Sequence, residues 1–205
     1  MRGLYVIVDP EACMCEPVLV AQAALRGGCC ALQLRDKHND DRTFARLGLE
    51  LASSCGRAGV PFIVNDRFWL ARELGAQGVH VGQTDTAIET VRKELGAGIS
   101  IGVSTHSLAQ AHDAQARGAQ LIGFGPVFAT SSKLDPGPVV GIEGLTQVCA
   151  ELAIPVVAIG GIRSERLDAV INAGTRVAAV ISAVCAAPDL EQVERAARML
   201  HAQLS

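Results

Sequence analysis

The sequence is poor in aromatic residues, and it has neither a long basic run nor a hydrophobic run long enough to span a membrane. Aromatic side chains make up only 3% of the 205 residues, whereas 49% of the residues are hydrophobic. Most apolar residues are therefore Ala, Val, Leu and Ile, which suit close packing of helices on a sheet. A net charge of −3 without a basic cluster argues against a nucleic-acid partner, and the short apolar runs argue against a membrane segment. We expect a cytoplasmic protein that holds any anionic substrate with local cations or a metal.

The cysteines are also not spaced as the ligands of a metal site would be. The chain has seven of them, an odd number, and most lie in apolar runs, which fits a reduced cytosolic chain. Cys13 and Cys15 flank Met14, but no second pair at metal-like spacing accompanies them. We therefore interpret both as ordinary loop or packing residues rather than as a metal or redox site.

Eight short apolar or β-branched runs recur along the chain. They span residues 4–8, 31–34, 61–64, 78–81, 99–103, 121–124, 155–159 and 177–181. Because these runs are too apolar to alternate, they predict strands covered on both faces, as in a parallel sheet. Parallel strands need crossover connections, and stretches with helical spacing lie between the runs. These stretches are 41–57, 90–95, 107–117, 143–152, 164–173 and 189–204.

Glycines mark the ends of several helical stretches just before a strand, at Gly27, Gly75, Gly118 and Gly174. This weak repeat and the order of strand and then helix predict an α/β protein, a (β/α)8 TIM barrel that forms a single domain over residues 1–205. An open doubly wound sheet would share most of these signals.

In such a barrel, residues directly after each strand point into the mouth of the active site. Gln33, Arg35 and Lys37 follow the second run and alternate toward one side, where two cations suit a pyrophosphate group. Alternatively, this segment is a loop whose charged side chains are simply solvated and bind no phosphate. Asp66 and Asp85 follow the third and fourth runs, and paired carboxylates at neighbouring strand ends can hold Mg2+. Each Asp could instead cap the helix that follows it.

The later strand ends carry hydroxyl groups and glycines. Ser104 follows the fifth run, and the hydroxyl-rich segment 129–133 after the sixth ends in Lys133. This loop is longer than a connector needs, which favours a lid or binding loop. Residues 160–161, a glycine pair, follow the seventh run and Ser182 follows the eighth, where barrels of this type build a phosphate cradle.

Five motifs resemble, in order, the signature of the thiamine-phosphate synthase (thiamine-phosphate pyrophosphorylase) family, which is sister to the thiazole tautomerases. They are Gln33-Leu34-Arg35-Asp36-Lys37, Val64-Asn65-Asp66, His80-Val81-Gly82-Gln83 with Asp85, Gly102-Val103-Ser104 and Gly125-Pro126-Val127-Phe128. Each motif lies at a different strand end, and the resemblance covers nearly the whole chain.

The resemblance implies an Mg2+-assisted transferase that joins two phosphorylated small molecules. It would condense 4-amino-2-methyl-5-pyrimidinylmethyl diphosphate with 4-methyl-5-(2-phosphoethyl)thiazole, or its carboxylate precursor, into thiamine phosphate and pyrophosphate. The implied pyrimidine diphosphate contacts are Gln33, Arg35, Lys37, Asn65, Ser104 and Lys133, and Arg35, Lys37 and Lys133 would be catalytic. The implied thiazole phosphate contacts are Thr130, Ser131, Ser132, Gly161, Ile181 and Ser182. The implied Mg2+ ligands are Asp66 and Asp85.

Two other functions stay open. A thiazole tautomerase-like isomerase would share the barrel, but members of that family can carry a histidine where this chain has Pro126. A non-catalytic binder of phosphorylated thiamine intermediates is the second alternative, because a fold alone fixes no activity.

The loop after the sixth run departs from the family pattern. The usual Pro-Thr-x-Thr-Lys is replaced by Ala129-Thr130-Ser131-Ser132-Lys133, so the proline is missing and the conformation of 129–141 is left open. We assign no role to His80 or His106. The sequence also leaves open whether the chain forms a homo-oligomer.

Overall fold

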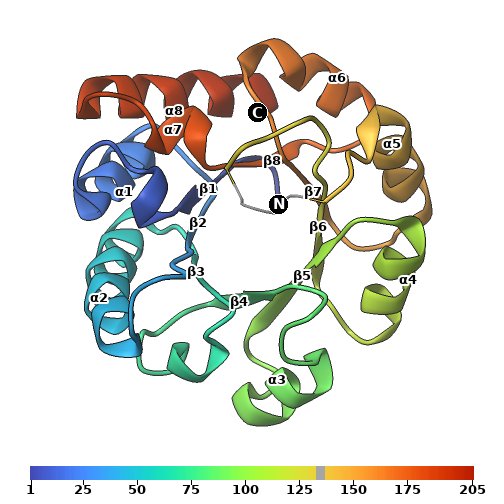
Figure 1. The fold of residues 1–205 in the computed structure, drawn as a ribbon, viewed down its shortest axis with the longest axis horizontal. Coiled ribbons are helices and arrows are strands. Elements are labelled where there is room, and N and C mark those ends of the chain that lie inside the picture. The colour runs from blue at the N-terminus through green and yellow to red at the C-terminus, as the bar shows by residue number, and fades with distance from the viewer. Residues whose placement is uncertain (133–136) are drawn as a thin grey trace.

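The computed structural model describes residues 1–132 and 137–205, and its centre is a closed barrel of eight parallel strands (Figure 1). Each strand pairs with its neighbours in chain order, and β8 pairs with β1 to close the ring. The strands are β1 (Gly3–Val8), β2 (Ala31–Leu34), β3 (Phe62–Asn65), β4 (Gly78–Val81), β5 (Ser100–Thr105), β6 (Leu121–Phe124), β7 (Val156–Ile159) and β8 (Val177–Val180). The predicted (β/α)8 barrel is confirmed, and the open sheet is excluded.

Helices surround the strands on the outside of the ring (Figure 1). They are α1 (Pro17–Arg26), α2 (Asp41–Ala58), α3 (Ile88–Leu95), α4 (Leu108–Ala116), α5 (Gly141–Glu151), α6 (Leu167–Asn172), α7 (Ser182–Cys185) and α8 (Leu190–Leu204). Local sequence explains their ends: Glu16 and Asp40 accept hydrogen bonds from the first turns of α1 and α2, and Gly59 closes α2 in the left-handed conformation.

One crossover differs from the predicted alternation of strand and α-helix. Between β3 and β4 the chain forms only a 3-10 helix, η2 (Phe68–Leu70), followed by turns. Asp66 at its entry has φ 59° and Gly75 at its exit has φ 62°, so both ends of this segment turn sharply.

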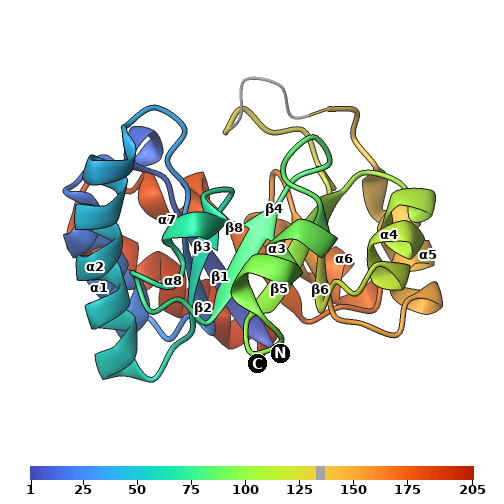
Figure 2. The same cartoon turned by 90° about the horizontal axis from the view of Figure 1, so that it is seen from below.

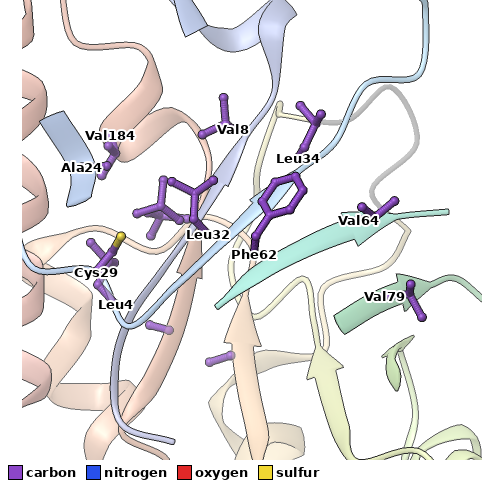
Figure 3. Packing of buried hydrophobic residues seen from close by; sticks show 14 of the residues in the cluster. Leu4, Val8, Ala24, Cys29, Leu32, Leu34, Phe62, Val64, Val79 and Val184 are labelled. Carbon is purple, nitrogen blue, oxygen red and sulfur yellow. The ribbon is translucent and has the colours of Figure 1, made fainter. Parts of the chain in front are cut away.

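Side-chain alternation along the strands divides the core into two layers. On β1, Leu4, Val6 and Val8 pack outward among the residues of the helices, whereas Tyr5 and Ile7 point into the barrel. Figure 3 shows the outer layer, where side chains of β1, β2, β3 and β4 pack together with Ala24, Cys29 and Val184. Aliphatic residues make up most of this layer, as the low aromatic content predicts.

The loops that follow the strands gather at one end of the barrel. Figure 2 shows the described parts of the segment between β6 and α5 at that end, while both chain termini lie at the opposite end. The strand register brings the ends of neighbouring strands level, with Val8 beside Leu34 and Asn65 beside His80. Within the described ranges, no helix combines the length and apolarity needed to cross a membrane.

Candidate active site

The cationic side chain after β2 lies against a carboxylate from β1. Arg35 forms an ion pair with Asp9, whose side chain is 95% buried and also accepts a hydrogen bond from the backbone N–H of Glu11. Only Nη1 of the guanidinium contacts Asp9, and an arginine has five N–H donors in total. The sequence prediction named Arg35 but missed Asp9, which is the residue that orients it.

Lys37 and the two predicted metal-binding aspartates form one cluster. The Lys37 ammonium pairs with Oδ2 of Asp66, and the carboxyl groups of Asp66 and Asp85 are hydrogen-bonded to each other. Oδ2 of Asp85 also accepts the backbone N–H of Gly82 at 2.7 Å. Neither carboxylate caps a helix, because α3 and η2 have no side-chain cap at their N-termini. The alternative of simple capping is therefore wrong for both residues.

The two aspartates have opposite pKa shifts. Burial raises the pKa of Asp66, and the adjacent Asp85 carboxylate raises it further, against the lowering effect of Lys37. Burial also acts to raise the pKa of Asp85, but hydrogen bonds from Asp66 and the Gly82 N–H, together with the Lys37 charge, bring it below its ordinary value. Two carboxylates this close repel each other when both are ionised, so the cluster favours a proton or a cation between them.

The donor set of this cluster fits Mg2+ better than a transition metal. Both ligand groups are carboxylates, and Mg2+ prefers hard oxygen donors while keeping several water or phosphate ligands. Among the residues that the structure describes, no cluster of three or more His, Cys, Asp and Glu side chains could form a complete protein cage. A pair of carboxylates open to solvent and substrate matches the Mg2+ binding mode rather than a structural zinc site.

Polar groups also line the inside of the barrel below the mouth. The side-chain amide of Gln33 donates to the hydroxyl of Tyr5 at 3.0 Å, and Nε2 of His80 lies 2.8 Å from Oγ of Ser104. The Gln33, Arg35, Asn65, His80 and Ser104 side chains line a small cavity of about 30 Å³ inside the strands. His80 thus orients the Ser104 hydroxyl.

A larger cavity of about 340 Å³ opens beside this one, over the ends of β5 to β8. Its lining includes all six residues of the predicted thiazole phosphate set: Thr130, Ser131, Ser132, Gly161, Ile181 and Ser182. The hydroxyl of Ser132 donates to that of Ser182 at 3.1 Å, which joins the loop after β6 to the start of α7. The two cavities share Ser104, Gly123, Ile159 and Ala179, so they meet at the barrel axis.

The glycine pair after β7 allows the loops after β6 and β7 to pack closely against each other at the wall of the larger cavity. A Cβ on Gly160 would lie 2.5 Å from Cα of Pro126, and a Cβ on Gly161 would lie 2.5 Å from the carbonyl oxygen of Ala129. Both glycines have positive φ, 97° and 63°. Any side chain at either position would push the loop after β6 away from the loop after β7.

Several lining residues were missed by the sequence prediction. Nη1 of Arg166 donates to the carbonyl oxygen of Gly161 at 2.6 Å, and its guanidinium lies 4.8 Å from the centre of the Phe128 ring. Arg163 and Glu165 also line the larger cavity. A signal for these residues was present, because they follow the glycine pair at the end of β7. His106, left unassigned, lies with Nδ1 2.5 Å from the Gly125 carbonyl oxygen.

The predicted site residues that the structure describes therefore fall into three sets at one end of the barrel. Gln33, Arg35, Asn65 and Ser104 share the small cavity, and Lys37, Asp66 and Asp85 form the charged cluster. The hydroxyl and glycine residues line the larger cavity. Lys133 lies outside the described residues, as do 134–136.

A closed (β/α)8 barrel with charged groups after its early strands and a glycine- and hydroxyl-lined cavity after its late strands is typical of enzymes that bind phosphorylated substrates. Comparison with known proteins narrows this class. The family described as thiamine monophosphate synthase matches residues 4–184, and the chain belongs to that family.

Individual relatives agree with this assignment. The thiamine-phosphate synthase of Methanocella arvoryzae is 43% identical over 204 residues, which cover 98% of this chain and 94% of the relative. That of Roseiflexus castenholzii is 43% identical over 197 residues, covering 95% and 86%. The solved structure of thiamine phosphate pyrophosphorylase from Pyrococcus furiosus has a TM-score of 0.89 and 34% identity, covering 99% of this chain and 95% of that one.

Proposed function

We propose that this protein is a thiamine-phosphate synthase, a transferase that joins a pyrimidinylmethyl group to a thiazole phosphate and releases pyrophosphate. The observation that carries the proposal is the meeting of two differently built subsites at Ser104. One has Arg35, Lys37 and paired carboxylates, and the other is the larger cavity beneath the loop after β6. Family membership supports the same activity.

The charged side of the site suits a leaving diphosphate. The bond from the pyrimidinylmethyl carbon to the diphosphate oxygen breaks first, and the electron-rich aminopyrimidine stabilises the resulting cation. Arg35 keeps N–H donors beyond its contact with Asp9, and Lys37 carries a mobile ammonium group, so both can hold the departing oxygens. Lys133 is proposed as a third cation, and Gln33, Asn65 and Ser104 as contacts of the pyrimidine diphosphate.

Asp66 and Asp85 are the residues that would hold Mg2+, since they are adjacent oxygen donors at neighbouring strand ends. The bound ion would supply positive charge to the diphosphate oxygens. Engagement of Asp66 by a cation would weaken its ion pair with Lys37 and leave that ammonium group for the substrate. The same step would relieve the repulsion between the two carboxylates.

The larger cavity would hold the thiazole phosphate. Hydroxyl groups of Thr130, Ser131, Ser132 and Ser182 and backbone N–H groups near Gly161 and Ile181 offer donors to phosphate oxygens. Because this cavity meets the small one at Ser104, a thiazole ring held here can direct its nitrogen at the pyrimidinylmethyl carbon. The new C–N bond forms once the diphosphate has left that carbon, and the closely packed wall limits access of water to the cation.

The test is a two-substrate assay with purified protein. Both phosphorylated substrates and Mg2+ should give thiamine phosphate and pyrophosphate in equal amounts, and omission of either substrate should abolish both products. A tautomerase would instead rearrange a thiazole carboxylate phosphate on its own, and a pure binder would bind the substrates without turnover. Either of these two results in place of pyrophosphate release rejects the proposed synthase.

A further inference from the structure

Two cysteines, distant in sequence, meet beside the site without a role in the proposed reaction. Cys13 follows the 3-10 helix η1 (Pro10–Ala12) in the loop after β1, and Cys185 is the last residue of α7. The backbone N–H of Met14 donates to the carbonyl oxygen of Cys185 at 3.1 Å, so the two segments run against each other. This backbone contact makes the two thiols neighbours, and each has the largest effect on the pKa of the other.

The two thiols differ in their access to solvent. Cys13 is half-buried, whereas Cys185 is 0% exposed and its Sγ lies 3.4 Å from the carbonyl oxygen of Ile7. A small oxidant in solution can therefore reach Cys13 but not Cys185. This is the arrangement of a reactive thiol next to a protected resolving thiol.

The pKa values of the two thiols shift in opposite directions, which also favours Cys13 as the reactive thiol and Cys185 as the resolving thiol. The neighbouring Cys185 thiol lowers the pKa of Cys13, and this outweighs burial and the nearby carboxylates of Asp9 and Glu16. The neighbouring Cys13 thiol, together with burial, raises the pKa of Cys185 well above its ordinary value. By contrast, burial raises the pKa of Cys149 to about 11, so that thiol is a poorer first target for peroxide than Cys13.

In place of the sequence interpretation of Cys13 as an ordinary loop residue, we propose that Cys13 and Cys185 are a redox-active dithiol that hydrogen peroxide oxidises to an intramolecular disulfide. The Cys13 thiolate attacks one peroxide oxygen, the O–O bond breaks, and hydroxide leaves while Cys13 becomes a sulfenic acid. The Cys185 sulfur then attacks the Cys13 sulfur, the S–O bond breaks, and a second hydroxide leaves. The protons of the two original thiols convert both hydroxides to water, so two thiols and one peroxide give one disulfide and two waters.

Disulfide formation would link the two sides of the site. Two thiol sulfur atoms that are not bonded lie farther apart than the roughly 2.0 Å of a disulfide, so one segment must shift when the bond forms. The Cys13 segment begins at Asp9, which pairs with Arg35, and α7 begins at Ser182, which lines the larger cavity. Any effect on turnover rests on the proposed synthase function, but the disulfide itself does not.

The experiment treats the reduced full-length chain with hydrogen peroxide and maps its peptides under non-reducing conditions. We expect the loss of two of the seven thiols and a cross-linked peptide that contains Cys13 and Cys185, reversible with a dithiol reductant. Cys13→Ser should abolish this cross-link, and because Cys13 is half-buried, the test does not depend on replacing the buried Cys185. Cys149→Ser is the matched control and should leave the cross-link intact.

Three results would overturn the proposal. The first is stable oxidation of Cys13 without a cross-link, the second is a cross-link through Cys15 instead, and the third is persistence of the cross-link in Cys13→Ser. A parallel assay compares turnover before oxidation, after oxidation and after reduction. A reduced enzyme without turnover would reject the synthase function but leave the peptide map valid, whereas unchanged turnover of a fully cross-linked chain would refute the coupling to the site.

Discussion

Replacing Gly161 with alanine should damage both the stability and the thiazole subsite, by two effects that the structure separates. Gly161 has φ 63°, and a non-glycine residue in this left-handed region costs about 1–2 kcal/mol. The added Cβ would also lie 2.5 Å from the Ala129 carbonyl oxygen and 2.9 Å from Cβ of Phe128. Such overpacking costs about 1–3 kcal/mol more. The free energy of unfolding should therefore fall by roughly 2–5 kcal/mol.

Gly75 offers a matched control for the backbone effect alone. Its φ is 62°, almost the same as that of Gly161, but nothing lies within 4 Å of a Cβ placed there. Gly75→Ala should therefore lower the free energy of unfolding by only about 1–2 kcal/mol, less the unfolded-state entropy that alanine removes. The difference between the two variants isolates the close contact of the loops after β6 and β7.

The assay pairs urea unfolding with steady-state kinetics in which the thiazole phosphate concentration is varied. Gly161→Ala should raise KM for the thiazole phosphate, because the loop that carries Ser131 and Ser132 must move outward to admit the methyl group. Gly75→Ala should leave both kinetic constants unchanged. Equal unfolding free energies for the two variants, together with an unchanged KM in Gly161→Ala, would refute the close packing on which this reasoning depends.

Three further predictions concern charged groups. Asp85→Asn keeps an acceptor for the Gly82 N–H but removes the charge. It should cost about 1.5–3 kcal/mol of transition-state stabilisation, so kcat/KM at limiting Mg2+ should fall roughly ten- to 150-fold. Asp189→Asn, which also replaces an acceptor of a backbone N–H, is the control, and equal kcat/KM values in both variants would contradict the metal role. Arg166→Met should raise KM for the thiazole phosphate with little change in kcat, and an unchanged KM would mean that its bond to the Gly161 carbonyl does not position the cavity wall. Hydrogen bonding to Arg117 lowers the pKa of Glu89 to about 2 from an ordinary 4.5, so the stability from this pair is present above pH 4.5 and is lost as pH falls toward 2. The small difference in urea midpoint between wild type and Glu89→Gln should therefore shrink between pH 4.5 and pH 2. A difference that stays constant over this interval would argue against the pair.

The barrel could be predicted from the sequence because its strands are short, apolar and buried on both sides. All eight predicted runs correspond to strands, with ends that differ by at most two residues. The segment after β3 was harder, because a 3-10 helix with sharp turns at both ends has no periodic pattern. Local turns of this kind depend on single φ values, and these leave little trace in the amino-acid sequence.

The site was predictable where the family motif fixes a strand end, and less so where contacts join different loops. Arg35 and Asp66 follow their strands directly and Asp85 lies in the loop after β4, so their gathering at one end follows from parallel topology. Asp9 was missed as a partner of Arg35 because the pairing joins the ends of β1 and β2. The contact between Cys13 and Cys185 required closure of the barrel, which places β8 beside β1.

The charged side of the site also explains how its cations are held before a substrate binds. Arg35 and Lys37 each lie against a carboxylate, Asp9 for the first and Asp66 for the second. Arg35 is only 16% exposed, so its pairing offsets the cost of a buried charge, whereas Lys37 is 43% exposed. The two pairs are not equivalent. Asp9 is 5% exposed and also bonds to the chain after β1, so it can keep Arg35 oriented when a diphosphate arrives. Asp66 instead shares its environment with Asp85, so a cation that binds both carboxylates competes directly with Lys37. The proposed metal and diphosphate should therefore each favour binding of the other, since the metal frees the ammonium group that the diphosphate needs.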